Sequence, residues 1–102
     1  MRNEELLIRL TQTQGIAGYE KKVRELIEQE VRPYADELIV DPLGSLIAVK
    51  KGKGGPHSKK IMFAAHMDEI GFMVKKIEDD GRLLVCNVGW NWTASAYNTR
   101  VV

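Results

Sequence analysis

The sequence predicts an α/β fold in which helices cover a mixed β-sheet. Apolar residues recur every three to four positions in the first third of the 102-residue chain, which is typical of amphipathic helices. Later segments instead show strand-like runs that flank glycine-containing turns. Between these segments, residues 60–65 (KIMFAA) contain a short continuous apolar run, which suits a central strand covered on both faces. The predicted order is therefore two helices followed by several strands.

Two helices are expected in the first third of the chain. The first covers residues 3–13, and a loop with two glycines separates it from a second helix over residues 19–32. Pro33 disfavours a helical conformation at the residue before it, so the second helix is expected to end there. The apolar positions of the two helices are Leu6, Leu7, Leu10, Val23, Leu26, Ile27 and Val31. Two helices hardly cover both faces of a sheet, which is a first indication that part of the chain is missing.

Two hairpins are expected after the helices. In residues 37–51, the runs ELIVD and SLIAVKK flank a Pro-Leu-Gly turn. In residues 70–89, two further apolar runs flank the turn DDG. The central strand predicted at residues 60–65 lies between these hairpins in the sequence. Together with the hairpins, it predicts a mixed sheet.

The composition is that of an ordinary globular protein, with 44% hydrophobic residues, 28% charged residues and a net charge of +1. No apolar run approaches the roughly 20 residues that a membrane-spanning helix needs, so no membrane partner is expected. Acidic residues and an arginine interrupt the N-terminal stretch, unlike a signal peptide. The single cysteine, Cys86, excludes an internal disulfide, fits a reducing compartment and is expected to pack in an apolar strand. These features predict a cytoplasmic protein.

A lysine-rich segment separates the first hairpin from the central strand. Residues 50–60 hold five lysines and no acidic residue, together with glycines and a proline. Because the segment lacks arginine and interleaved aromatic residues, we interpret it as a solvated loop and expect no nucleic-acid partner. His57 lies in this loop and is expected to be exposed to solvent.

His66 and Asp68 follow the predicted central strand. Residues two apart on a strand project to the same side, so these two side chains are expected to share a face. In open α/β sheets, ligands bind beyond the carboxyl ends of the strands. An imidazole there can bind a metal, and a neighbouring carboxylate can orient the ring. From spacing alone, a hydrogen-bonded surface histidine remains an alternative, because no His-Glu-x-x-His or paired Cys-x-x-Cys motif supplies further ligands.

Several motifs in this order resemble the N-terminal part of the two-metal glutamyl and deblocking aminopeptidases. They are GIAGYE, VDPLGSLIAVKKG, KIMFAAHMDEIGFMVKKIEDDGRLLVCNVG and TRVV. This family includes tetrahedral TET-type assemblies, and some members are labelled endoglucanase M or cellulase. The resemblance extends from about Glu5 to Val102, and AAHMDEIGFMV (residues 64–74) is its most specific motif.

The resemblance implies a helix-sandwiched, zinc-peptidase-like catalytic domain that cleaves N-terminal residues from peptides. His66 matches the first metal ligand of the family, for zinc or cobalt, and Asp68 matches the catalytic-site aspartate that orients this histidine. Glu69 receives no role from the resemblance and is expected near the mouth of the site. In such enzymes a pair of metal ions polarises the scissile carbonyl and activates a water.

The resemblance also implies that the site requires more chain. The bridging aspartate, the general-base glutamate, further carboxylates and a second histidine of the family all lie downstream of the matched region. Residues 1–88 would form the N-terminal part of the catalytic domain, and residues 89–102 would begin an inserted β domain used in assembly, which implies a homo-oligomer. Asn98 and Thr99 stand where the family has Gly and Gln, so no role is assigned to Arg100.

These considerations lead to a main hypothesis and an alternative. The main hypothesis is an N-terminal fragment of a metal-dependent aminopeptidase, which is inactive as an isolated chain because one histidine cannot hold two metals. The alternative is a small non-catalytic association module that retains the aminopeptidase sheet, since incomplete sheets expose edges that pair. Cellulase activity is not expected, because no pair of carboxylates is marked for glycoside hydrolysis.

Overall fold

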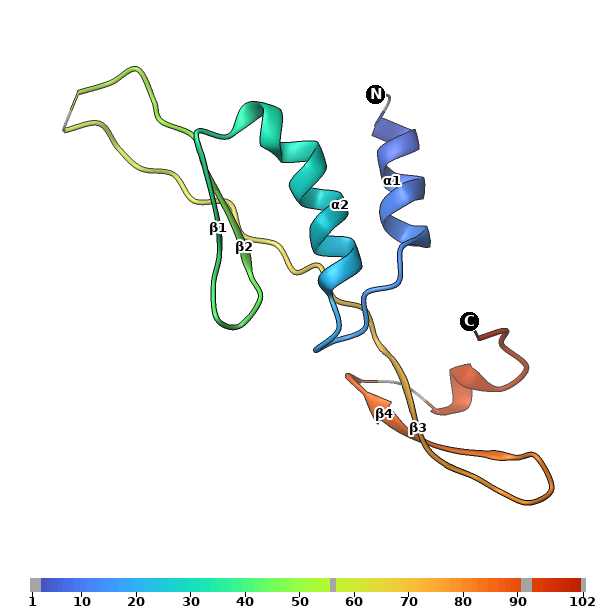
Figure 1. Ribbon diagram of the computed structural model, residues 1–102. Coiled ribbons are helices and arrows are strands. Elements are labelled where there is room, and N and C mark those ends of the chain that lie inside the picture. Colours follow the sequence, from blue (N-terminus) through green and yellow to red (C-terminus); the bar gives the residue numbers. More distant parts are fainter. Residues whose placement is uncertain (1–2, 56, 91–92, 102) are drawn as a thin grey trace.

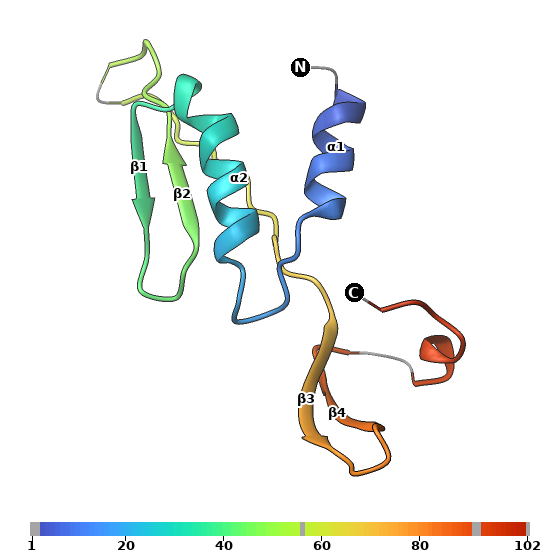
Figure 2. The ribbon, with the colours of Figure 1, turned by 45° about the vertical axis from the view of Figure 1, so that its right-hand side comes forward.

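The computed structural model of the chain describes residues 3–55, 57–90 and 93–101, and it has two helices followed by antiparallel strands (Figure 1). This order agrees with the predicted α/β class. The elements are α1 (Asn3–Gln12), α2 (Lys21–Val31), the 3₁₀ helix η1 (Arg32–Tyr34), β1 (Glu37–Val40), β2 (Leu46–Val49), β3 (Gly71–Ile77), β4 (Leu83–Val88) and the 3₁₀ helix η2 (Thr93–Ala96). Helix α2 lies between α1 and the β1–β2 hairpin in both views (Figures 1 and 2).

Helix α2 is shorter at both ends than predicted. Gly18 has a left-handed φ of 87°, and the Tyr19 N–H donates to the Ile16 carbonyl at 2.8 Å, so a turn precedes the helix. At the other end, Pro33 is accommodated within η1, where a 3₁₀ turn continues the chain beyond Val31. Local turn chemistry therefore decides both boundaries.

Both predicted hairpins are confirmed. Strands β1 and β2 pair antiparallel, and so do β3 and β4, the latter with an irregularity in register between Val74 and Lys76. The β1–β2 turn is held by the carboxylate of Asp41, which accepts hydrogen bonds from the N–H groups of Leu43 (3.0 Å) and Ser45 (2.8 Å). Gly44 in this turn has a φ of 92°, a conformation that favours glycine.

The predicted central strand is wrong for this structure. Residues 60–68 pair with no strand in the described chain, and each hairpin forms a separate two-stranded sheet. The apolar run is also not covered, since the side chain of Phe63 is 95% exposed. The physical reason is that a β-strand is defined by hydrogen bonds to a neighbouring strand. In each hairpin the two strands already pair with each other, and neither hairpin pairs with residues 60–65. No mixed sheet forms among the described residues.

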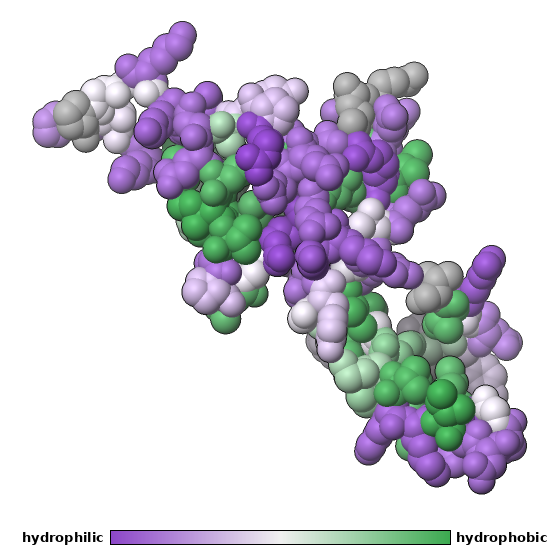
Figure 3. All heavy atoms as spheres, in the orientation of Figure 1, coloured by the Kyte–Doolittle hydropathy of each residue, from purple (hydrophilic) through white to green (hydrophobic). Residues whose placement is uncertain are grey.

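The chain is extended and buries little apolar surface. Its radius of gyration is 18.4 Å, whereas a compact chain of this length has about 13 Å. Val23, at 5% exposure, is the one buried apolar side chain among the described residues, and Cys86 is exposed rather than packed. Figure 3 shows apolar side chains gathered over both hairpins. Within the described segments, no helix is long and apolar enough to cross a membrane.

This exposure leads to a first prediction. The isolated 102-residue chain is expected to self-associate and to bind a hydrophobic dye, because contiguous apolar surface and unpaired strand edges favour association. Light scattering over a range of protein concentrations measures the association. A monomer that binds no dye at every concentration would contradict the prediction.

Candidate functional site

Glu69, which directly follows His66 and Asp68 in the same segment, joins this segment to the loop between α1 and α2. Glu69 and Ile16 form a parallel β-bridge, in which the Glu69 N–H donates to the Gly15 carbonyl at 2.8 Å. The Ala17 N–H donates to the Glu69 carbonyl at 3.3 Å. This junction is the point at which the otherwise unpaired segment is attached to the helical part of the chain.

His66 and Asp68 contact each other directly. The Nδ1 atom of His66 lies 3.0 Å from Oδ1 of Asp68 and 3.1 Å from the Asp68 backbone oxygen. Both oxygens are acceptors here, so Nδ1 is the donor in these contacts, and in the imidazole tautomer with its hydrogen on Nδ1 the other nitrogen, Nε2, is an acceptor. The His66 side chain is 85% exposed, and that of Asp68 is 43% exposed. The arrangement therefore presents an oriented imidazole to solvent.

A hollow of about 370 Å³ lies beside this pair. It is lined by Glu20, Ile27, Leu43, Gly44, Ser45, Leu46, Ala65, His66, Met67 and Asp68. The β1–β2 turn thus forms one wall, and the segment around His66 forms another. Arg24 of α2 fixes the turn, because its Nη1 donates to the Gly44 carbonyl at 3.0 Å.

The donor types at this hollow fit one corner of a metal site. A neutral imidazole nitrogen and a carboxylate oxygen are ligands that zinc and cobalt accept. In the described parts of the chain, however, no group of three or more His, Cys, Asp or Glu side chains is placed to hold a metal ion. Two groups are too few for a closed site, so these residues alone supply only part of one.

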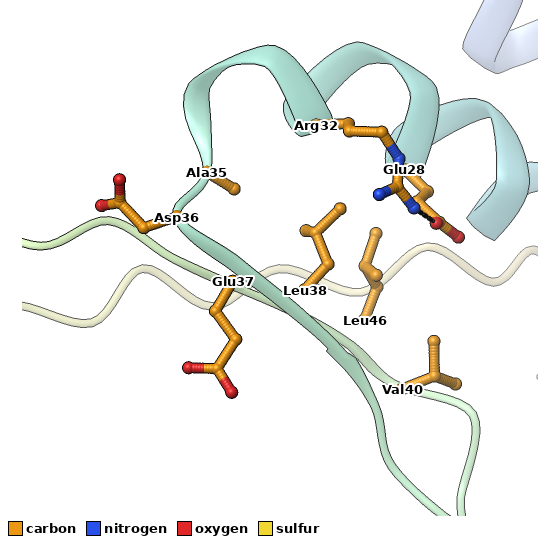
Figure 4. Close-up of a pocket in the computed structure, with 8 residues that line it drawn as sticks. All are labelled: Glu28, Arg32, Ala35, Asp36, Glu37, Leu38, Val40 and Leu46. Carbon is orange, nitrogen blue, oxygen red and sulfur yellow. Dashed lines mark hydrogen bonds and ion pairs between the residues drawn. The ribbon is translucent and has the colours of Figure 1, made fainter.

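A second hollow, of about 190 Å³, lies between the end of α2 and the first strands (Figure 4). Its charged residues include Glu28 and Arg32, which pair with each other across one helical turn. Among the described residues, no histidine, cysteine, serine or threonine lines it. It therefore offers neither a hydroxyl or thiol nucleophile nor a histidine ligand and is a poorer candidate than the hollow beside His66.

The structure places the predicted residues at one hollow and adds contacts that spacing did not indicate. His57 lies exposed in the lysine-rich loop, as expected. Glu69 does not line the hollow, although it was expected near its mouth, and instead contacts Gly15. The roles of Glu69 and Arg24 depend on loops that meet only in the folded chain, so no local sequence signal marks them.

The turn beside the hollow predicts a pH effect. Hydrogen bonds from the Ser45 N–H, and also from the Leu43 N–H, hold the pKa of Asp41 below its ordinary value of 3.8. Since the folded-state pKa is depressed, the turn keeps its full stability above the ordinary pKa and loses it as pH falls through the lower folded value. NMR should then show the Leu43 and Ser45 amide shifts moving at acidic pH. Asp41→Asn is the control, and an identical acid response in it would contradict this cause.

Comparison with known families gives a match over more than half of the chain. Residues 44–102 match the family described as M42 glutamyl aminopeptidase. A relative from Acetivibrio thermocellus, named provisionally as an aminopeptidase, is 53% identical over 85 residues, which cover 83% of this chain and 24% of the relative. The chain thus spans about a quarter of the length of this relative.

Solved structures give the same result. A TET aminopeptidase from a marine sediment archaeon (Thaumarchaeota archaeon SCGC AB-539-E09) is similar with a TM-score of 0.79 and 36% identity, over 89% of this chain and 25% of that one. A Thermotoga maritima protein named endoglucanase has a TM-score of 0.73 and 43% identity, over 81% and 26% of the two chains. The dodecameric PhTET1-12s has a TM-score of 0.72 and 40% identity, over 88% and 26%.

Proposed function

The chain belongs to the M42 glutamyl aminopeptidase family, and on this premise we propose that it supplies one corner of a two-metal peptidase site. Residues 1–88 form the N-terminal part of the catalytic domain, and residues 89–102 begin an inserted β domain. By the complete enzyme we mean these residues together with the rest of a catalytic domain of the relatives' length. The proposed reaction is the release of N-terminal residues from peptides.

The observation that carries the proposal is the contact between His66 and Asp68. Asp68 Oδ1 accepts a hydrogen bond from the Nδ1–H of His66 and thereby selects the tautomer whose Nε2 can bind a divalent metal, zinc or cobalt. Asp68 thus acts as the orienting carboxylate, and the hollow beside the pair is the space for the end of a peptide. When bound, two metal ions supply Lewis-acid polarisation of the scissile carbonyl and an activated water.

The 102 residues by themselves are proposed to be inactive. The described residues place one histidine and two carboxylates, those of Glu20 and Asp68, at the hollow, but no three such side chains are grouped to hold a metal ion. Residues 60–68 also pair with no strand of the described chain. A dinuclear centre requires more ligands than this, held within a closed cavity. The remaining ligands and the general base are therefore proposed to come from other parts of the complete enzyme.

Assembly and location follow as parts of the same proposal. The solved dodecamer supports a homo-oligomer for the complete enzyme. The single cysteine supports a cytoplasmic location.

The exposed apolar faces of both hairpins favour the second candidate function, a non-catalytic association module that keeps part of the aminopeptidase sheet.

Peptide hydrolysis tests the proposal. With added zinc or cobalt, the complete enzyme is expected to remove residues from peptides with a free N-terminus and to lose this activity to a chelator. N-acetylated versions of the same peptides are compared, because an enzyme that needs a free N-terminal amine leaves them intact whereas a deblocking enzyme cleaves them. The isolated 102-residue chain is expected to show no turnover with either metal. Turnover by that chain would contradict the need for further ligands, and a complete enzyme without metal-dependent activity would favour the association module.

A further inference from the structure

We infer that Glu69 is a positioning residue, whose carboxylate holds the segment bearing His66 and Asp68 against the loop before α2 by accepting a hydrogen bond from Gly15. The inference rests on the proposed function, because it concerns how the same site is held. The bond joins the Gly15 N–H to Oε1 of Glu69 at 2.9 Å. It links residues 54 positions apart in the sequence.

The side-chain bond completes a three-point attachment. The backbone of Glu69 already accepts from Ala17 and donates to Gly15. With the carboxylate added, both the N–H and the C=O of Gly15 are bonded to the same residue. A single residue therefore fixes both the distance and the rotation of the two segments relative to each other.

Close packing at the junction explains why the position of Gly15 matters. A Cβ added to Gly15 would lie 2.6 Å from Cγ1 of Val23 and 3.5 Å from the backbone oxygen of Met67. Gly15 is thus pressed between α2 and the segment that carries His66. On the neighbouring side, a Cβ at Gly71 would lie 2.5 Å from Cδ1 of Ile16. Little room exists for the segments to slide, so the hydrogen bonds select one register.

The geometry separates Glu69 from the metal corner. The four consecutive residues 65–68 line the hollow, whereas Glu69 does not. The Glu69 carboxylate instead lies against the loop before α2, where it accepts from the Gly15 N–H at 2.9 Å. A role for Glu69 as metal ligand or general base would require its carboxylate to leave Gly15.

The junction also connects the two walls of the hollow. Residues 60–68 have no paired strand in the described chain, so their attachment at Glu69 sets where His66 lies. The other wall, the β1–β2 turn, is held to α2 by Arg24. Gly15, in the loop before α2, packs against Val23 of that helix. Because Glu69 is bonded to Gly15, the position of α2 helps to set the position of the segment that carries His66.

The test compares Glu69→Gln, Glu69→Asp and Glu69→Ala in the complete enzyme. Gln keeps the length and an acceptor oxygen but removes the charge, whereas Asp keeps the charge but is one methylene too short to reach Gly15. Cobalt(II) affinity is measured by titration of the visible absorption of the bound ion, and kcat and KM are measured separately. Glu25→Ala, which removes an exposed carboxylate from α2, is the matched control.

If Glu69 is a positioning residue, the Glu69→Gln variant is expected to bind cobalt nearly as well as the unsubstituted enzyme. Asp and Ala should weaken cobalt binding about 10- to 100-fold, the loss typical when the support of a metal ligand is removed, and should alter the absorption spectrum. The opposite order, with Asp near normal and Gln as weak as Ala, would overturn the inference in favour of a ligand or base. Unchanged binding in all three variants would also overturn it. If Ala does not fold, the order of Gln and Asp decides alone.

These outcomes differ from failure of the proposed function. An unsubstituted complete enzyme that binds no cobalt and cleaves no peptide would reject the two-metal proposal itself, and the role of Glu69 with it. If the unsubstituted enzyme is active and the Glu69 variants have the same cobalt affinity, kcat and KM as Glu25→Ala, only the role of Glu69 is rejected.

Discussion

Replacing His66 by alanine in the complete enzyme is expected to empty one of the two metal positions and to remove nearly all peptidase activity. Among the described residues that line the candidate site, His66 is the one histidine, and its contact with Asp68 leaves Nε2 as the atom that can bind metal. Loss of a supporting partner costs about 10- to 100-fold in metal affinity, so loss of the ligand itself should cost more than about 100-fold. Elemental analysis of the purified protein and kcat/KM with a free peptide measure the two effects.

The chain provides a matched control for this experiment. His57, the other histidine, lies exposed in the lysine-rich loop and away from the hollow. His57→Ala should retain full metal content and activity. Asp68→Asn should fall between the two, because an amide oxygen can still accept from Nδ1 without the negative charge. Unchanged metal content in His66→Ala would remove His66 from the set of ligands.

Replacing Gly15 by alanine is expected to destabilise the complete enzyme by about 1–3 kcal/mol, which is the usual cost of overpacking a tight site. The new Cβ would lie 2.6 Å from Cγ1 of Val23, a β-branched side chain with little rotational freedom. Relief requires the loop to move away from α2, which would also lengthen the hydrogen bonds to Glu69. Thermal denaturation measures the loss of stability, and cobalt titration measures its effect on the site.

Gly55→Ala is the control for the Gly15 experiment. Apart from the residues next to it in the chain, no described residue has an atom within 4 Å of a Cβ built on Gly55, so this substitution adds the same methyl group without a clash. It should leave the melting temperature and cobalt affinity unchanged. Equal melting temperatures for both variants would mean that the junction around Gly15 tolerates expansion.

Local signals in the sequence were sufficient for the helices and hairpins. The three-to-four-residue period predicted α1 and α2 to within two residues at each boundary. The turns at residues 42–44 and 79–81 were predicted from proline, glycine and aspartate, because those residues have strong local conformational preferences. The absence of strand pairing at residues 60–65 of the described chain was not predictable in the same way. An apolar run indicates burial, but its neighbours must come from elsewhere in the fold.

For the candidate site, the sequence by itself determined the residue types and their spacing. His66 and Asp68 are two positions apart, which places them on one side of an extended segment and permits their contact. Only the tertiary structure decided what surrounds them, including the β1–β2 turn held by Arg24 and the junction at which Glu69 accepts from Gly15. The physical reason is the separation along the sequence of the residues that interact. Spacing along a strand is a property of the local backbone, whereas a hydrogen bond across 54 residues exists only after the loops have packed together.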